Sequence, residues 1–562
     1  MSTRCFPLFA LAISGLLFIS AAFAEPSLTI GERELHPLSP DIFGQFLERP
    51  SWDGEYGPEA VCDEHGKLSP EIERHLAGMH APVVRFPVGT DGDYIDWTDM
   101  INLAGRAQRP VTIGHENNRV TNRFGFDEYF DLAGRMGWRT VLVVNLRDAL
   151  YKQKPLAVAA AHAAALVAYC GASFTNDSSG WAAKRAANGH IEPWSIAAVQ
   201  VGNEGWFFWP PKPEERAALR LTNDFSCVQW LHECLVAYAD AIKRVRPDLP
   251  LIADAPRPLD GGGLENNSAS IWREAVDSDE VRSRYQLLAA HAYAPLGIWT
   301  TQRNGTNLPT GSLADDDIWN ALVSTLGRFD ANGQCIADAA AYDDIQKLGY
   351  KAAVTEWNWN GWDFAKKFPQ ASFKEGVPAA LGTAGFLQGL MRYPNVPLAN
   401  QSMMLGTTWG ITSVRVRKGG SVGYLPQGEA VRLIAEHHGK SVVASELTGI
   451  ARVKTPVRLT TWWPQVAQIA EVDGLVTVDD QTWYVHLINR QRCDSIKLTI
   501  LLPVVAAQSG KATIYKLTGE SSATTTRVGG MKHITEKIDW LNQSMKVTLP
   551  PASISVVAIP KG

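Results

Sequence analysis

The feature that most constrains the fold is a repeating order of segments between residues 38 and 412. A short apolar run is followed by a Gly- or Asp-rich loop and then by a longer amphipathic segment. This alternation is typical of βα units with parallel strands. Eight candidate strands lie at residues 42–47, 83–86, 140–145, 196–201, 251–253, 287–291, 352–355 and 402–405. Amphipathic helices fit between them, for example at 127–136, 156–169, 225–245 and 379–391. We therefore expect an α/β fold, in the form of a closed (β/α)8 TIM barrel. The alternative, an open doubly wound sheet, has no support from a Gly-rich dinucleotide-binding motif after the first strand.

The pattern changes after residue 412. Short runs rich in β-branched residues occur at 467–472, 475–478, 482–488, 495–501, 511–516, 545–549 and 554–559. Such runs predict an antiparallel β-sandwich over residues 413–562. The strand-like residues 27–30 have no helix after them, so we expect the segment 25–37 to pair with the sandwich. No low-complexity linker separates the two predicted domains, which indicates close packing.

The first 24 residues have the features of a secretory signal. Arg4 supplies the positive end, residues 8–18 are mostly apolar, and Ala-Phe-Ala at 22–24 fits the small-x-small cleavage pattern. An uncleaved membrane anchor is the alternative, but the apolar run is short for a span. We expect a mature chain from Glu25 that is secreted or periplasmic and has no membrane association after cleavage.

Charge and cysteine usage exclude several classes of partner. The net charge of -5, without blocks of like charge, gives no electrostatic footprint for nucleic acid. The 19 Trp residues suit a carbohydrate, because an indole face can cover the C–H face of a sugar ring. Cys227 and Cys234 lie seven apart in a predicted helix, too far to be bridged, and we expect buried thiols. No CxxC motif or His/Cys cluster predicts a metal site.

Two predicted strands are followed by a glutamate at the barrel end where catalytic residues gather. Glu204 follows the fourth strand, Glu356 follows the seventh, and tryptophans flank both. Glycosidic cleavage needs one carboxylic acid to protonate the leaving oxygen and one carboxylate to attack or to activate water. The alternative, a surface charge at each strand end, fits a single glutamate better than such a pair. The pattern therefore predicts a glycoside hydrolase.

These residues also carry a resemblance to a known family. Gly-Asn-Glu at 202–204 and Thr-Glu-Trp-Asn at 355–358 resemble the clan A barrel glycosidases, and the chain is most similar to family 51, the α-L-arabinofuranosidases. Further similar segments lie at 42–48, 85–87, 96–97, 124–129, 185–190 and 549–553. The resemblance covers nearly the whole predicted mature chain. It implies a barrel with a C-terminal β-sandwich, retention of anomeric configuration, no cofactor, and a possible homo-oligomer.

The resemblance also implies roles for individual residues. Glu204 would be the acid/base and Glu356 the nucleophile. Glu48 would bind sugar hydroxyls, Asn203 the 2-hydroxyl, and Tyr293 would donate a hydrogen bond to the nucleophile. For Glu48 a surface charge is the alternative. The further candidate substrate-binding residues are His291, which could equally be a core histidine, and Trp206, Trp359 and Trp409.

The chain departs from the family pattern at two places. Where the family has Gly-Gly-Asn after Arg-x-Pro, residues 88–90 are Val-Gly-Thr, so an amide that holds the terminal arabinose is missing. Near the eighth strand, Met403 stands where a sugar-binding glutamine is usual, and Gln401 lies two residues earlier. Each loss of a partner for a sugar hydroxyl costs about 1–3 kcal/mol. These changes leave the predicted reaction type unaffected, but they weaken the prediction that the substrate is an arabinofuranoside.

Three functions follow as hypotheses. The first is an exo-acting, retaining α-L-arabinofuranosidase that removes arabinose from plant cell-wall polysaccharides or oligosaccharides. The second is a retaining endo-β-glycanase on the same barrel, with a xylan or glucan chain in an open cleft. The third is a non-catalytic sugar-binding protein, which would have no need for both glutamates.

Overall fold

The computed structural model describes residues 25–51, 54–55, 57–114, 117–175, 177–254, 268–298, 300–417, 419–455, 457–460 and 463–561. The predicted signal, residues 1–24, lies outside the described residues. Within these described ranges, no helix is both long and apolar enough to cross a bilayer.

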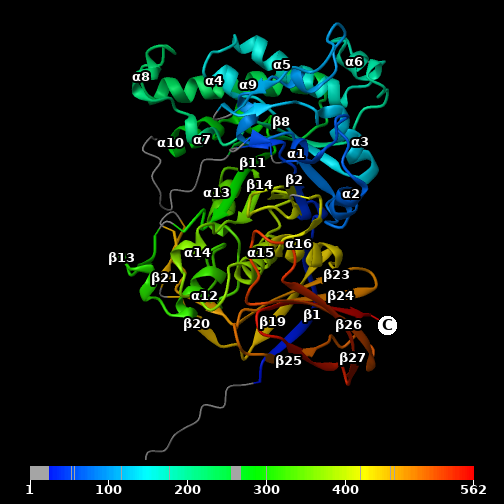
Figure 1. Cartoon of the computed structure of the whole chain (residues 1–562), viewed down its shortest axis with the longest axis vertical. Helices are drawn as coiled ribbons and strands as arrows, with labels where there is room; N and C mark the ends of the chain where they lie inside the picture. Colours follow the sequence, from blue (N-terminus) through cyan, green and yellow to red (C-terminus); the bar gives the residue numbers. More distant parts are fainter. Residues whose placement is uncertain are drawn as a thin grey trace, which may run out of the picture.

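Eight parallel strands close into a barrel, each paired with the strands before and after it in the chain, in the upper part of Figure 1. They are β2 (Gly44–Phe46), β5 (Val83–Phe86), β8 (Arg139–Val144), β9 (Ile196–Val201), β10 (Leu251–Asp254), β11 (Leu287–Ala294), β14 (Lys351–Trp359) and β15 (Leu398–Ser402). The predicted (β/α)8 barrel is therefore present.

The eighth strand is the one that the sequence placed wrongly. It was expected at 402–405, on an apolar run, but β15 ends at Ser402. Its interior is polar and held by hydrogen bonds: Asn400 Nδ2 donates to the Gln45 carbonyl at 3.0 Å. Gln401 Oε1 accepts from Gln45 Nε2 at 3.0 Å. Polar residues that hydrogen-bond to a neighbouring strand can occupy a barrel interior, so an apolar run was a misleading guide here.

Helices follow the strands and cover the outside of the barrel. The main ones are α2 (Pro70–Ala77), α3 (Phe126–Met136), α5 (Leu156–Gly171), α9 (Asp224–Val245), α10 (Ser268–Val276), α12 (Asp315–Val323), α13 (Ala339–Lys347), α15 (Gly376–Met391) and α16 (Pro426–Glu436). Shorter helices are α1 (Pro58–Val61), α4 (Arg147–Leu150), α6 (Trp181–Ala187), α7 (Gly205–Phe208), α8 (Pro213–Arg216), α11 (Asp279–Arg282) and α14 (Phe364–Lys367).

Helix α16 changes the predicted domain boundary. It is the helix that follows the eighth strand, and it packs on α15. The repeating β/α unit therefore ends near Glu436 rather than at residue 412, because the last barrel unit includes its own helix.

The C-terminal strands and β1 form a closed sheet of nine strands. In sheet order they are β1 (Ser27–Pro37), β19 (Ser441–Thr448), β23 (Val472–Val478), β24 (Thr482–Asn489), β29 (Ser553–Pro560), β26 (Ser509–Gly519), β27 (Met531–Leu541), β28 (Ser544–Leu549) and β25 (Ile496–Leu501). Neighbours are antiparallel except β1 and β25. The sequence predicted a sandwich of two sheets, whereas hydrogen bonding here runs continuously round one closed sheet.

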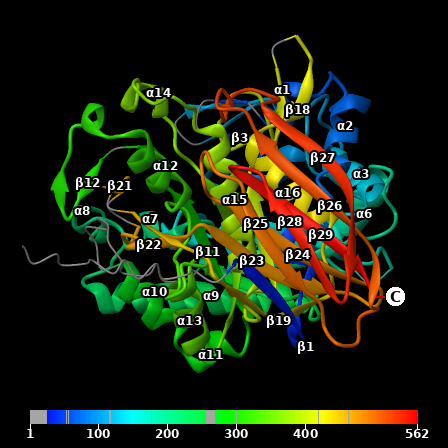
Figure 2. The ribbon, with the colours of Figure 1, turned by 90° about the horizontal axis from the view of Figure 1, so that it is seen from below.

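The first described strand belongs to this C-terminal sheet, as the sequence predicted. Figure 2 shows β1, in blue, beside the orange strands β19 and β23. β1 is antiparallel to β19, with Ser27 opposite Thr448, and parallel to β25, with Ser27 opposite Thr499. Both ends of the described chain therefore meet in one sheet.

The closed sheet packs on the barrel through a shared core, and further small sheets of two or three strands lie among the described residues. The small strands are β3 (Pro50–Ser51), β4 (Gly54–Glu55), β6 (Thr112–Ile113), β7 (Arg119–Val120), β12 (Gln302–Arg303), β13 (Thr306–Asn307), β16 (Leu405–Gly406), β17 (Val414–Val416), β18 (Val422–Tyr424), β20 (Arg452–Lys454), β21 (Val457–Arg458) and β22 (Gln468–Ala470). β21 pairs with β12 of the barrel region. One hydrophobic core cluster includes residues of both the barrel and the closed sheet.

A buried charge cluster also joins the two parts. Asp473 on β23 is fully buried and accepts from Arg392 at 2.6 Å, from Arg490 at 2.5 Å and from the Cys335 amide at 2.9 Å. Burial raises the pKa of Asp473, but the two guanidinium groups outweigh it and hold the pKa below its ordinary value. Loss of any one partner would leave an uncompensated charge at the seam between barrel and sheet.

Cys227 and Cys234 are buried on α9 and form no disulfide, as their spacing predicted. Burial raises the pKa of both thiols, so they stay protonated.

Candidate active site

The structure brings Glu204 and Glu356 together at the carboxyl-terminal mouth of the barrel. Glu204 follows β9, and Glu356 lies near the end of β14. One carboxylate oxygen of each and one ring nitrogen of His291 lie within 4.8 Å of one another. Carboxylate oxygens this close fit the short carboxyl separation of retaining glycosidases, roughly 5–5.5 Å, rather than the roughly 6.5–9.5 Å of inverting ones.

The backbone at Glu204 adopts a conformation that few non-glycine residues take. Its φ is 50°, in the left-handed region, and Gly202 has a φ of 87°. Glu204 caps the short helix α7, so the chain reverses sharply between strand and helix at this residue. Such backbone costs about 1–3 kcal/mol and concentrates at functional sites.

Arg85 on β5 organises the nucleophile side of the site. Its guanidinium is fully buried and donates to Glu356 Oε1 at 2.7 Å, to Gln200 Oε1 at 2.9 Å and to Asn203 Oδ1 at 2.6 Å. It also lies over the Phe46 ring, 4.5 Å from the centroid. Arg85 begins the segment 85–87 that resembles family 51, but the sequence alone predicted no role for it. An arginine inside a short buried strand was the available signal, since a buried guanidinium needs partners.

Tyr293 on β11 completes the surroundings of Glu356. Its hydroxyl donates to Glu356 Oε2 at 2.9 Å, so each carboxylate oxygen has one strong donor. Burial and the nearby Glu356 charge raise the pKa of Tyr293 well above its ordinary value, which keeps the phenol a donor. The two donors orient Glu356 and stabilise its negative charge.

His291 connects the two glutamates to the sixth strand. Its Nδ1 lies 2.9 Å from Glu204 Oε1, and its Nε2 lies 3.0 Å from Thr355 Oγ1. Trp206 packs edge-on against the imidazole, with ring centroids 5.1 Å apart. His291 is therefore part of the site, where it positions Glu204.

Glu48 lies in the same site, next to Gly89. Its Oε1 accepts from the Gly89 amide at 3.1 Å. Burial, then repulsion by Glu356, raises the pKa of Glu48 well above its ordinary value. A Cβ at Gly89 would stand 2.9 Å from Glu48 Oε1 and 3.4 Å from Glu356 Oε1. The loop after β5 therefore needs glycine to approach both carboxylates.

The tryptophans differ from the prediction. Trp359 is 1% exposed, and its indole nitrogen donates to the Leu322 carbonyl at 3.2 Å, in the helix layer. The prediction that it binds substrate is wrong, because β14 continues past Glu356 and alternate residues point out of the barrel. Trp206 is 5% exposed and supports His291, so it offers little surface to a sugar.

Trp409 lies at the eighth-strand side of the mouth. It is partly buried and packs with Tyr293, Met403 and Ile411. Met403 is fully buried. Gln401 Oε1 accepts hydrogen bonds from Gln45 Nε2 and from Ser413 Oγ, both at 3.0 Å. Apolar side chains therefore pack beside Tyr293 on this side of the mouth.

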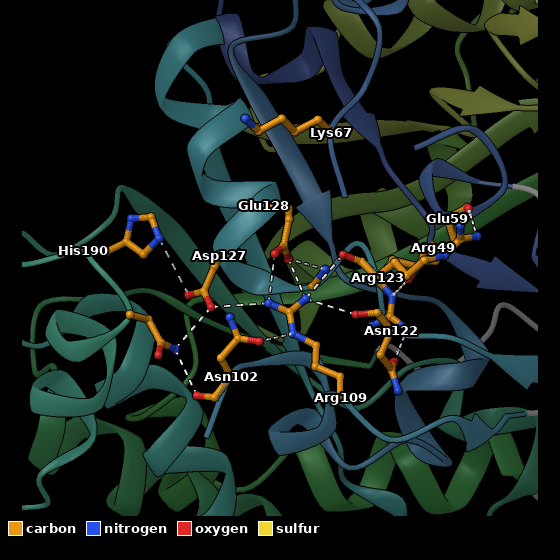
Figure 3. A network of polar contacts seen from close by, with 12 residues as sticks. Arg49, Glu59, Lys67, Asn102, Arg109, Asn122, Arg123, Asp127, Glu128 and His190 are labelled. Carbon is orange, nitrogen blue, oxygen red and sulfur yellow. Dashed lines mark hydrogen bonds and ion pairs between the residues drawn. The ribbon is translucent and has the colours of Figure 1, made fainter. Parts of the chain in front are cut away.

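Figure 3 shows a polar network that includes Arg49, the residue after Glu48 in the chain. Arg49 and Glu59 form a fully buried ion pair at 2.7 Å. Arg49 also donates to Asn122 Oδ1 at 2.8 Å, and the Asn122 carbonyl accepts from Arg109 at 3.0 Å. Arg109 in turn forms a bidentate pair with Glu128, at 2.6 and 2.9 Å. Two loops of the mouth and the start of α3 are thereby held in one arrangement.

Glu204, His291 and Glu356 have donor atoms close enough to hold a cation. Both oxygens of Glu356 already accept from Arg85 and Tyr293, however, and the guanidinium places a positive charge beside them. This donor set suits proton transfer and nucleophilic attack better than metal binding.

The comparisons with known proteins agree with this geometry. Residues 75–293 match the family model of the alpha-L-arabinofuranosidase 1 domain. Alpha-L-arabinofuranosidase C of Emericella nidulans is 26% identical over 230 residues, which are 39% of this chain and 40% of that protein. The intracellular exo-alpha-(1->5)-L-arabinofuranosidase of Halalkalibacterium halodurans is 26% identical over 185 residues, 32% of this chain and 33% of that protein. The matched part thus spans 40% or less of the length of these curated relatives.

The fold comparison extends over nearly the whole chain. The alpha-L-arabinofuranosidase of Thermotoga maritima, solved as an arabinose complex, has a TM-score of 0.69 at 19% identity and covers 95% of this chain and 100% of its own. The chain is therefore similar to the family 51 α-L-arabinofuranosidases, in the sequence of most of its barrel and in its overall fold.

Proposed function

We propose that the protein is a retaining glycoside hydrolase, an exo-acting α-L-arabinofuranosidase that removes arabinose from plant cell-wall polysaccharides or oligosaccharides. The observation that carries this proposal is the close approach of Glu204 and Glu356, with Arg85 and Tyr293 donating to the latter. The sequence relatives, which are named arabinofuranosidases, support the choice of sugar.

The first chemical step joins the sugar to the enzyme. Glu204 protonates the leaving glycosidic oxygen while a Glu356 oxygen attacks the anomeric carbon, so a C–O bond to the leaving group breaks and an ester bond forms. Asn203, held by Arg85 at 2.6 Å, is placed to bind the 2-hydroxyl. The positive character of the anomeric carbon in the transition state is stabilised by the Glu356 charge.

The second step releases the sugar. Glu204, now ionised, takes a proton from water as the water oxygen attacks the anomeric carbon, and Glu356 leaves as a carboxylate. His291, at 2.9 Å from Glu204, keeps the carboxyl in place for both proton transfers. Two displacements at one carbon leave the anomeric configuration unchanged.

The test is hydrolysis of aryl glycosides and plant polysaccharides by the wild type beside Glu356→Ala. Release of arabinose that is lost in the variant supports the proposal. Oligosaccharides from an undecorated xylan or glucan would establish the endo-β-glycanase instead. Sugar binding without hydrolysis by the wild type would favour the non-catalytic alternative.

We further propose that the chain is exported to the periplasm or the medium after cleavage near residue 24. The charged and apolar segments of the first 24 residues support this. N-terminal sequencing of the protein from culture medium and cell fractions tests it: a start at Met1 inside the cell would contradict export.

A further inference from the structure

Arg49 follows Glu48 directly, and the main chain of both residues is enclosed by two neighbouring segments. The Arg49 amide donates to the Pro87 carbonyl at 3.2 Å, which extends the pairing of β2 and β5 toward the mouth. On the other side, the Gly57 amide donates to the Arg49 carbonyl at 3.1 Å. A Cβ at Gly57 would lie 2.0 Å from the Glu48 carbonyl oxygen, so this approach needs a residue without a side chain. The main chain at Glu48 therefore has little freedom to move.

The Arg49 side chain joins the same place to two more segments. Its Nε lies 2.7 Å from Glu59 Oε1, and neither side chain has any exposed surface. Its Nη2 donates to Asn122 Oδ1 at 2.8 Å. Asn122 is fully buried as well, and its Nδ2 donates to the Pro110 carbonyl at 2.8 Å. One guanidinium therefore links α1 and the segment between β7 and α3 to the residue after Glu48.

The segments that carry Glu59 and Asn122 are also linked to each other. Arg123 donates to the Glu59 carbonyl at 2.9 Å. Asn122 has a φ of 59°, a left-handed conformation that asparagine adopts more readily than most residues. A buried charge that loses its partner disturbs its surroundings strongly, so this arrangement depends on the Arg49 guanidinium beside Glu59.

The Glu48 carboxylate borders the space in which Glu356 would attack a sugar. Glu48 Oε1 accepts from the Gly89 amide at 3.1 Å. A Cβ at Gly89 would lie 2.9 Å from this oxygen and 3.4 Å from Glu356 Oε1, so the two carboxylates face one small space. Glu48 Oε2 has no hydrogen-bond partner among the described residues. It is therefore available to a sugar hydroxyl.

We propose that Arg49 is a positioning residue that fixes Glu48 for sugar binding. Its contacts with Glu59 and Asn122 hold the main chain at this point in place. Glu48 in turn binds hydroxyl groups of the sugar that Glu356 attacks. Arg49 does not touch the sugar, because its side chain is fully buried. A carboxylate fixed in advance loses less conformational freedom on binding, which increases the affinity. This inference deepens the proposed function and rests on it.

The first test is the steady-state kinetics of Arg49→Lys on an aryl α-L-arabinofuranoside. Lysine keeps the positive charge but cannot bind Glu59 and Asn122 together through a planar fork. An interaction that is lost equally in the ground state and the transition state raises KM and leaves kcat unchanged. We therefore expect KM to rise about tenfold, with kcat within about twofold of the wild type. An unchanged KM in a folded variant would show that Arg49 has only a structural role.

The matched control is Arg185→Lys. Arg185 is also fully buried, and its guanidinium donates to the carbonyl groups of Tyr169 and Ala172 at 2.7 and 2.9 Å, in the helix layer. Both variants should lose stability, but only Arg49→Lys should raise KM. If Arg185→Lys raises KM by the same factor, the effect reflects general destabilisation and the proposal is wrong.

A double-mutant cycle tests whether Arg49 acts through Glu48. In Glu48→Ala no carboxylate is left to position, so the addition of Arg49→Lys should change KM by less than about twofold. An equal rise of KM with and without Glu48 would contradict the proposal, because Arg49 would then act by another route.

A milder variant decides the matter if Arg49→Lys does not fold. Asn122→Gly accepts the left-handed backbone and removes the acceptor for Arg49, so KM should rise about threefold. A KM equal to that of the wild type would overturn the proposal. If the wild type hydrolyses no arabinofuranoside, the proposed function fails. The same variants are then compared by the calorimetric Kd for L-arabinose, with the same factors expected and the same outcomes against the proposal.

Discussion

The buried arginine–carboxylate cluster at the barrel mouth differs from the one at the seam with the closed sheet in how fully its carboxylate is bound. At the seam, Asp473 has three donors and is fully buried. At the mouth, Glu356 has one donor on each oxygen, and its side chain keeps 9% of its surface exposed. The difference separates a structural charge from a reactive one. The seam carboxylate has its oxygens occupied by three hydrogen-bond donors, whereas the mouth carboxylate is oriented by two donors and remains accessible to a substrate.

The largest effect is expected from Glu356→Gln. The amide oxygen can still accept from Arg85, and its NH2 group can donate to the Tyr293 oxygen, so the fold should be retained, but the amide cannot attack the anomeric carbon. We expect kcat/KM to fall at least about 10⁴-fold on every substrate, as loss of a nucleophile does in other enzymes. Steady-state kinetics measures the loss of kcat/KM, on a variant preparation whose unfolding temperature equals that of the wild type. Substantial activity in a preparation free of wild type would show that Glu356 is not the nucleophile.

Glu204→Ala should sharpen the distinction between the two glutamates. A natural linkage needs protonation of its leaving oxygen, so hydrolysis should slow by about 10²–10⁴-fold, whereas an activated aryl glycoside should be affected much less. The ratio of kcat/KM for the two substrates is the measurement. Equal slowing of both substrates would remove the acid role from Glu204.

Asp473→Ala tests the seam cluster. It leaves the buried Arg490 and the partly buried Arg392 without their common acceptor and should lower the free energy of unfolding by about 3–5 kcal/mol. The kcat of the folded fraction should stay at the wild-type value, because the seam does not contact the mouth residues. Urea unfolding and kinetics on the same preparation check both statements. Loss of activity without loss of stability would contradict the purely structural role of Asp473.

Tyr293→Phe removes one of the two donors to Glu356 and keeps the ring. A hydrogen bond to a charged group is worth about 1.5–3 kcal/mol, which corresponds to about a 10–100-fold lower kcat/KM. The matched control is Tyr285→Phe on the barrel wall, where the hydroxyl donates to the Leu235 carbonyl at 2.8 Å. If both variants lose the same activity, Tyr293 has no special role at the nucleophile.

The smallest effect concerns pH and the closed sheet. His486 on β24 is fully buried, and burial lowers its pKa from 6.5 to about 3. The unfolded chain therefore binds more protons between these values, so His486 reduces stability as pH falls from about 6.5 to about 3. In His486→Gln this loss should be smaller, while the activity profile near neutral pH should not move. Unfolding free energies at pH 7 and pH 4 measure the difference.

Periodicity predicted most of the barrel, since seven of the eight strands coincide with predicted segments. It failed at β15, where Asn400 and Gln401 are buried by hydrogen bonds to Gln45. Periodicity also placed the end of the barrel at residue 412, before α16. No further predicted barrel strand comes after the eighth one, so the pattern gave no sign that this helix belongs to the barrel. β27 was not predicted, since most of its side chains are exposed and its sequence has few apolar runs.

The site was predictable in its two glutamates but not in its supports. The position of Glu204 and Glu356 after strands could be read from spacing, and Glu48, Asn203, His291 and Tyr293 do lie at the mouth. Arg85 was missed because one arginine in a strand does not reveal which distant residues it will bind. Trp359 was misplaced because the length of β14 past Glu356 decides on which side of the sheet the ring lies.

The position of β1 has a consequence for biosynthesis. Ser27 is hydrogen bonded to Thr448, 421 residues further along the chain. During synthesis β1 therefore emerges first and stays without its partners until almost the whole chain has left the ribosome. The barrel can assemble before that point, but the nine-stranded sheet can close only afterwards. Closure of the sheet is therefore a late step that waits for synthesis of the C-terminal strands. Removal of residues 25–37 would leave β19 and β25 with open edges and should make the protein more prone to self-association.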